Sequence, residues 1–108
     1  MVSRDFLYHA CQSLDTCGID CFIQEVEELR GAIGDFDLAI EDIMSEGDRA
    51  ISVITMCGSF NRPLFGVNPT HKAIGITCAI TWQLQRGKVR YVNMMVDMAH
   101  LRLQVAAA

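Results

Sequence analysis

Basic residues are scarce in this sequence. Its 108 residues include nine lysines and arginines against thirteen aspartates and glutamates, which gives a formal net charge of −4 at neutral pH. Proteins that bind nucleic acids gather lysine and arginine on one face to contact phosphates, and no such run occurs here. The composition therefore argues against a nucleic-acid partner.

Long apolar runs are also missing. The longest, such as residues 73–80, are interrupted by glycine and threonine and are far shorter than the roughly 20 apolar residues that span a bilayer. Residues 1–5 do not lead into the apolar stretch and small-residue cleavage site of a secretory signal peptide. We therefore expect no membrane partner, with a cytoplasmic location as the default.

Paired cysteine spacings are absent as well. The cysteines form an odd set of five: Cys11, Cys17, Cys21, Cys57 and Cys78. Such a set suits reduced, mostly buried thiols in a cytosol better than a secreted disulfide framework. His9 and the first three cysteines carry zinc-binding groups, but their spacing, H-x-C-x5-C-x3-C, matches no standard zinc pattern. No metal site is expected.

Motifs for common cofactors and nucleophiles are missing too. The sequence has no G-x-S-x-G elbow, no P-loop and no G-x-G-x-x-G, so serine hydrolysis and nucleotide binding lack support. A catalytic cysteine is not expected either. We predict a protein without a cofactor.

Apolar residues, in contrast, are plentiful, since 51% of the chain is hydrophobic. A domain of this length buries roughly two-thirds of its unfolded surface, so one core is expected. We predict a single domain over residues 1–105. Residues 106–108, three alanines without a pattern, are set aside as a cloning remnant.

Apolar periodicity predicts one main helix. Between residues 19 and 33 apolar side chains recur at three- and four-residue steps, with Gln24, Glu25 and Arg30 among the residues on the remaining faces. Gly34 follows, where helices often end. Residues 6–11 fit either an edge strand or a helix.

After Gly34 the period changes to two, which is typical of strands. We predict strands over residues 36–43, 50–60, 72–85 and 89–96, turns at 46–48 and 86–88, and one or two closing helical turns over 98–104. Residues 50–60 are apolar at both odd and even positions, so both faces of that strand are expected to be covered.

Short motifs over residues 35–104 resemble a known family in their order and spacing. They are Gly47-Asp48-Arg49, Gly58, residues 64–70, Lys72, Gly87-Lys88-Val89 and Val96-Asp97-Met98. Together they resemble the SnoaL-like polyketide cyclase group of the nuclear-transport-factor-two-like superfamily. More faintly, Tyr8-His9 and residues 18–22 resemble the segment before that family's third helix.

The resemblance implies a fold and an assembly. Members are α+β proteins in which a strongly bent antiparallel mixed sheet, here of about four to five strands, packs on one main helix. The result is a cone or half-barrel with an interior pocket for small hydrophobic molecules, usually in a homodimer formed through the sheet. The family normally starts with one or two further helices. Only eight residues precede His9 here, so either the chain is a shortened form or a partner subunit covers the gap.

Asp97 is the strongest catalytic candidate, because the resemblance aligns it with the family's acid/base residue. A carboxylate among apolar neighbours loses hydration and holds its proton more tightly than an exposed one, which suits proton transfer beside a carbonyl. The alternative is a helix N-cap, since Asp97 immediately precedes the closing helical turns. The two roles can coexist.

The remaining candidates would line the pocket. His9 matches a recurring family histidine and is a second catalytic candidate, although a lone histidine is more often structural. The predicted ligand-binding residues are Trp82, Tyr91, Asn93, Met95, Ile54, Met56, Phe60 and Ile80. Core packing explains the apolar and aromatic members equally well, whereas Asn93 needs a partner, such as Asp97 or a ligand.

Departures from the family pattern leave the function open. Val92-Asn93 stands where members often have His-Trp, Cys57 and Phe60 where they often place Arg and His, and Ile80 at an inward acidic position. The pocket has therefore lost polar groups. Our leading hypothesis is a cyclase or isomerase that uses Asp97 on a hydrophobic carbonyl compound. The rivals are a non-catalytic binding module and a dimerising scaffold of the same fold.

Overall fold

The computed structural model describes residues 2–9 and 16–107. Within them the chain forms six strands and two helices. In order these are β1 (Val2–His9), β2 (Thr16–Cys17), α1 (Ile19–Ala32), β3 (Ile33–Glu46), β4 (Arg49–Phe60), β5 (Ala73–Gln85), β6 (Lys88–Val96) and α2 (Met98–Ala107). Neither helix is long and apolar enough to cross a membrane.

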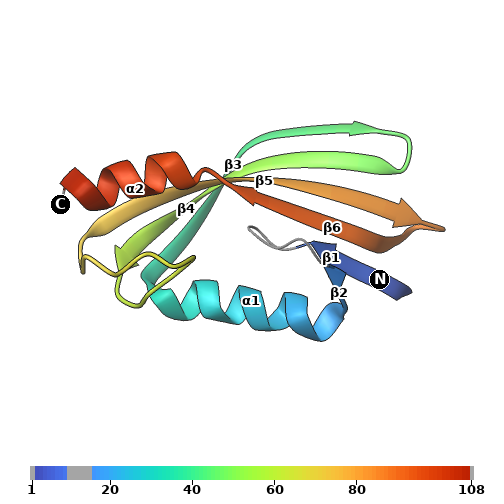
Figure 1. Ribbon diagram of the computed structural model, residues 1–108. Helices are drawn as coiled ribbons and strands as arrows, with labels where there is room; N and C mark the ends of the chain where they lie inside the picture. Colours follow the sequence, from blue (N-terminus) through green and yellow to red (C-terminus); the bar gives the residue numbers. More distant parts are fainter. Residues whose placement is uncertain (1, 10–15, 108) are drawn as a thin grey trace.

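All the strands belong to one mixed sheet with the order β2-β1-β6-β5-β4-β3. Strands β3 to β6 form an antiparallel meander, whereas β1 adds to the edge of β6 in the parallel direction. Figure 1 shows the sheet bending so that the β3–β4 hairpin curves away from the plane of β5 and β6. The α+β class, the bent mixed sheet and the single main helix are thus confirmed.

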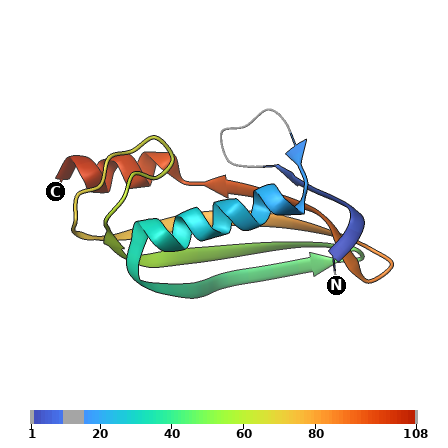
Figure 2. The ribbon, with the colours of Figure 1, turned by 90° about the horizontal axis from the view of Figure 1, so that it is seen from below.

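Helix α1 covers one face of the sheet, and the core lies between them (Figure 2). Phe22, Val26 and Leu29 recur at steps of four and three residues, so they share one side of the helix. On this side of the helix, Phe22 packs against Tyr8 of β1 with ring centroids 4.8 Å apart. We call the face of the sheet toward α1 the inner face and the opposite one the outer face.

A tight approach between β3 and β4 accompanies the bend. Gly58 has φ 156°, and a Cβ atom at this position would overlap the Gly34 carbonyl oxygen and the Ile33 side chain. Only glycine fits there. A register shift between Ile40 and Asp42 then reverses the alternation of β3, so that Ile43 lies on the same face as Ile40.

Helix α2 packs along the part of β5 that β6 does not reach. The last β5–β6 pair is Cys78 with Val96, so the preceding residues of β5 have no strand on that side. There, Gln104 takes the place of a strand: its Oε1 accepts from Gly75 N–H at 2.9 Å, and its Nε2 donates to the Gly75 carbonyl at 2.7 Å. Leu101 of the same helix is fully buried.

Three expectations differ from the structure. The main helix ends at Ala32 and β3 follows directly from Ile33, so Gly34 does not end the helix; the positive φ of 51° falls on Asp35. Residues 6–11 fitted either an edge strand or a helix; residues 6–9 belong to a strand that begins earlier, at Val2, and residues 10 and 11 lie outside the described part. Strand β4 is covered on one face only, because α1 packs on the inner face and Ile51 on the outer face stays exposed.

The cysteines also differ from the expectation of reduced thiols. Cys21 is disulfide-bonded. Cys57 is an exposed free thiol and Cys78 a buried one. The prediction is therefore wrong for Cys21 and holds for these two.

Candidate functional site

A cavity of about 600 Å³ lies between α1 and the inner face of the bent sheet. Four of its lining residues come from the helix: Phe22, Val26, Leu29 and Arg30. The sheet contributes Phe36, Leu38, Ile40, Ile43, Ala50, Ser52, Ile54, Met56, Ile80, Trp82 and Met94. The walls are almost entirely apolar, and their side chains come from one face of four strands.

Strand register explains how these residues meet. Ser52 pairs with Ile80 and Ala50 with Trp82, and on the other side of β5 Ile80 pairs with Met94. Directly paired residues point to the same face of a sheet, so a row of inner-face side chains runs across β4, β5 and β6. The bulge in β3 extends that row to Ile43.

Two polar side chains interrupt the apolar lining. The Trp82 Nε1–H donates to the Ser52 hydroxyl at 3.0 Å, which satisfies the indole and fixes its orientation. Arg30, in the last turn of α1, holds its guanidinium carbon 6.0 Å from the centre of the Phe36 ring. The cavity thus carries one uncharged hydrogen-bonded pair and one cation.

The cavity is open along β3. Ile40 and Ile43 are 61% and 59% exposed although both line it. Leu38 and Val26, which line it as well, are also exposed. Apolar side chains at the mouth therefore remain in contact with water until something covers them.

Half of the predicted ligand-binding residues lie in this cavity. Ile54, Met56, Ile80 and Trp82 all line it. Phe60, at the end of β4, is completely buried but belongs to the core beyond the cavity, where its backbone bonds to His71 and Lys72. These five residues share the inner face.

Tyr91, Asn93 and Met95 are not among the residues that line the cavity. Val92 pairs with Trp82 and Met94 with Ile80, so the even-numbered residues of β6 face the cavity. The odd-numbered ones therefore point to the outer face. The sequence correctly predicts a strand here with side chains on alternating faces. It does not show which face is inside, because Val92 and Met94 at even positions and Met95 at an odd position are all apolar.

Metal-binding groups do not gather among the described residues, where no group of three or more His, Cys, Asp or Glu side chains could hold an ion. His9 and Cys21 are described, whereas the side chains of Cys11 and Cys17 lie outside the described part. The zinc arrangement considered from the sequence therefore stays untested as a whole.

Comparison with known proteins identifies the family. Residues 1–105 match the sequence profile of the SnoaL-like polyketide cyclases. The chain belongs to the SnoaL-like polyketide cyclase family. The resemblance seen in the short motifs is thus confirmed. No protein of curated function is similar enough in sequence to match this chain.

Solved structures of the SnoaL-like fold superpose on nearly all of the chain. A proposed SnoaL-like polyketide cyclase from Jannaschia sp. CCS1 has a TM-score of 0.82 and 18% identity, covering 99% of this chain and 74% of that one. AclR, a proposed hydroxylase from Streptomyces galilaeus, gives 0.79 and 20%, covering 99% and 79%. A SnoaL-like polyketide cyclase from Agrobacterium tumefaciens strain C58 gives 0.81 and 11%, covering 97% and 80%. At these identities the likeness shows the fold.

Asp97, which the resemblance to SnoaL-like cyclases made the main catalytic candidate, lies where β6 passes into α2. Its Oδ1 accepts from the His100 N–H at 3.0 Å, and its backbone carbonyl accepts from Leu101 N–H at 3.2 Å. The residue is exposed and is not part of the cavity lining. The helix-capping alternative thus describes its hydrogen bonds, and the apolar surroundings expected for the carboxyl are not seen.

His9, the second candidate, ends β1 and pairs with Asn93 of β6 in the parallel register. Tyr8 beside it pairs with Val92 and is buried. His9 and Asn93 therefore share the outer face, while Tyr8 points inward. The structure brings these two polar residues together, away from the cavity that Trp82 lines.

Sequence reasoning missed two polar groups on α1. Arg30 was placed on the faces away from the apolar stripe, and it is exposed; it also lines the cavity, four residues after Val26. Glu25 is half-buried beside Tyr8; burial raises the pKa of its carboxyl, the hydrogen bond from Tyr8 partly lowers it, and nearby Glu28 raises it further. The four-residue spacing was the available signal for Arg30, whereas Glu25 depends on contact with β1.

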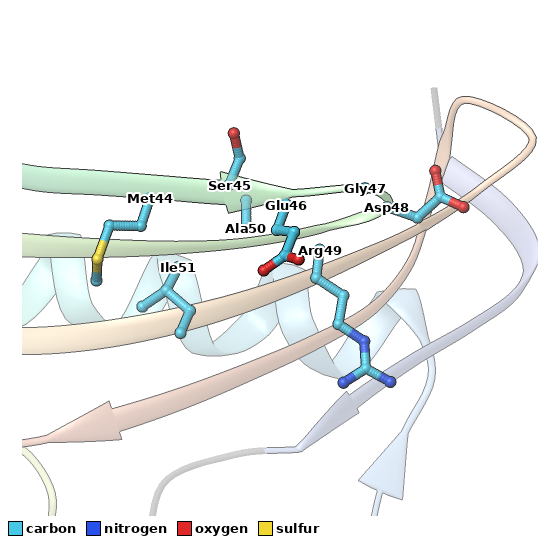
Figure 3. A pocket seen from close by; sticks show the side chains of 8 residues that line it. All are labelled: Met44, Ser45, Glu46, Gly47, Asp48, Arg49, Ala50 and Ile51. Atoms are coloured by element: carbon cyan, nitrogen blue, oxygen red, sulfur yellow. The ribbon is translucent and has the colours of Figure 1, made fainter.

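A second hollow, of about 690 Å³, lies at the tip of the β3–β4 hairpin. Figure 3 shows Met44, Glu46, Arg49 and Ile51 extending to one side of the hairpin and Ser45 to the other. All of its lining residues come from residues 44–51, so it is the surface of one twisted ribbon. We therefore take the cavity beneath α1 as the candidate site.

Proposed function

We propose that this protein binds a small hydrophobic molecule in the cavity between α1 and the sheet, and that this binding serves a cyclase-type role. The observation that carries the proposal is the lining itself, which is apolar apart from Arg30 and the bonded Ser52–Trp82 pair. The volume of about 600 Å³ lies within the range of small-molecule sites. Exposed Ile40 and Ile43 at the mouth provide apolar surface that a ligand would remove from water.

The hydrophobic effect supplies the affinity in this proposal. Each 100 Å² of apolar surface removed from water contributes roughly 2.5 kcal/mol before the entropic cost of binding. The hydrogen-bonded Trp82 ring offers a rigid aromatic wall for a flat molecule. A fused-ring ketone or a similar carbonyl compound combines the necessary apolar area with a polar edge.

Catalysis by Asp97, with help from His9, is the more specific form of the proposal. Its support is the position of Asp97 in a motif shared with the family. Its geometry is less favourable, because the carboxyl caps α2 and both residues lie outside the cavity lining. We therefore place binding first, with a non-catalytic binding module or a dimerising scaffold as the alternatives.

We also propose that the outer face of the sheet mediates a homodimer. Met44, Ile51 and Met95 are exposed there, on three different strands. An uncovered apolar surface of this kind favours association. Size-exclusion chromatography with light scattering should give twice the chain mass, and Ile51→Glu should shift it to a monomer. A wild-type monomer at micromolar concentration would contradict this part.

A matched pair of alanine-to-leucine substitutions tests the binding proposal. Ala50→Leu adds volume inside the cavity, whereas Ala39→Leu makes the same change on the outer face of β3. With the uncharged dye Nile red, fluorescence titration should show binding to the wild type and to Ala39→Leu, and binding at least about tenfold weaker to Ala50→Leu. Equal affinities for all three proteins, or no binding by the wild type, would contradict the proposal.

A further inference from the structure

Among the residues whose side chains the structure describes, Arg30 is the one charged residue that lines the cavity beneath α1. Its guanidinium stands over the Phe36 ring at the end of the cavity where α1 passes into β3. Among the described residues it forms no ion pair, although Glu27 and Asp35 lie nearby in the sequence. A guanidinium carries five N–H donors and no acceptor, so these donors remain available to a ligand.

The rest of the lining leaves the guanidinium without a competitor. Ser52 already accepts the Trp82 N–H at 3.0 Å, and the other lining side chains are apolar. An anion entering the cavity therefore meets one charged partner, at one end, and no carboxylate that repels it. Arg30 is exposed, so water screens part of its charge. The apolar walls beside it still favour a charge-assisted hydrogen bond to a ligand over one between two fully hydrated groups.

The usual explanation for a basic residue in this position is the helix dipole, since Arg30 belongs to the last turn of α1. That explanation accounts for a positive charge near the C-terminus. It does not require the guanidinium of this exposed residue to lie beside the Phe36 ring, at the wall of the cavity. Stacking on an aromatic ring holds the fork in a defined orientation.

We infer that the ligand of this cavity is an acidic amphiphile, with an apolar ring system along Trp82 and Ile54 and a carboxylate that pairs with Arg30. The inference rests on the proposed function, because it names the chemical class of the molecule bound at that site. A bidentate pair between the guanidinium and the carboxylate fixes the orientation of the ligand, with its apolar end toward the open mouth.

Two probes of the same shape and different charge test this inference. Anthracene-2-carboxylate is the anion, and anthracene-2-methanol is its uncharged counterpart. We expect the wild type to bind the carboxylate about tenfold more tightly than the alcohol, as measured by fluorescence titration. Arg30→Gln should reduce this ratio to about one, mainly by weakening the binding of the carboxylate. Arg30→Lys should keep part of the preference, because it retains the charge without the planar fork.

Arg62→Gln is the matched control, because Arg62 is exposed and contributes to the surface beside Gly31 instead of the cavity. This variant should keep the wild-type ratio, and thermal unfolding should show that all the variants fold. Equal binding of both probes to the wild type and to Arg30→Gln would overturn the inference and leave the hydrophobic site standing. Failure of the wild type to bind either probe would overturn both proposals.

Discussion

The two faces of the sheet differ in how far their side chains are exposed to water. Met94 and Met95 are neighbours in β6, yet Met94 is 6% exposed and lines the cavity, whereas Met95 is 55% exposed on the outer face. The difference arises because α1 covers the inner face, and no described element is layered over the outer face at this point. Identical side chains one residue apart therefore have different physical roles.

The two faces also differ in the kinds of side chain that they carry. Its apolar row surrounds a cavity with a single cation, Arg30. The outer face mixes exposed Ile51 and Met95 with polar residues such as Thr81 and Asn93. Our two proposals follow this difference: a ligand on the inner face and another copy of the chain on the outer face.

The largest expected effect comes from truncating the two methionines separately. Met94→Ala should lower the free energy of unfolding by about 2–4 kcal/mol, because it removes buried methylene groups and enlarges a cavity. Met95→Ala should change the free energy of unfolding of the monomer by no more than about 0.5 kcal/mol, as is usual for exposed positions. Urea unfolding monitored by circular dichroism measures both. Both changes are made in the Ile51→Glu background, which the dimer proposal expects to be monomeric. Similar losses there would contradict the exposed position of Met95 on the outer face.

A smaller effect is expected where the two faces end, at Asp97. Asp97→Ala should lower the free energy of unfolding by about 1 kcal/mol, because the His100 N–H loses its capping acceptor. Asp97→Asn should leave the free energy of unfolding almost unchanged, since asparagine caps helices as well as aspartate does. Thermal unfolding of the two variants distinguishes the roles. If Asp97→Asn keeps its stability but abolishes turnover of a carbonyl substrate, the catalytic form of the proposal gains direct support.

The smallest effect concerns Glu25, an acid placed in the helix layer beside Tyr8. Burial raises the pKa of Glu25 above its ordinary value of 4.5, so the folded protein holds this proton more tightly than the unfolded chain. The stability linked to this proton is complete below that ordinary value and is lost as the pH rises through the raised pKa.

Glu25→Gln should therefore stabilise the protein at pH 7 and have little effect near pH 3.5. The gain should be less than about 1 kcal/mol, because water screens a half-exposed group. Thermal unfolding at the two pH values measures it, with Glu27→Gln as an exposed control of equal charge change. Destabilisation by Glu25→Gln at pH 7 would show that the ionised carboxylate is the favoured partner of Tyr8.

Local patterns in the sequence predicted most of the elements. The three- and four-residue spacing from Ile19 onward corresponds to α1, and the period of two corresponds to β3, β5 and β6 within a few residues. Turn chemistry placed the hairpin at Gly47, which adopts φ 59°. The family motifs predicted the bent α+β sheet. The helix, the strands and the turn depend on neighbouring residues, so a single sequence contains them.

The tertiary structure alone decided which face of each strand became the inside. Residues 92–95 are apolar at both parities except for Asn93, so only pairing with Trp82 and Ile80 shows that Met94 enters the cavity and Met95 does not. The bulge after Ile40 and the parallel pairing of β1 with β6 follow the same rule. Each depends on contacts between segments far apart in the chain or on a register shift of one residue, and a slip of one residue exchanges the two faces of a strand.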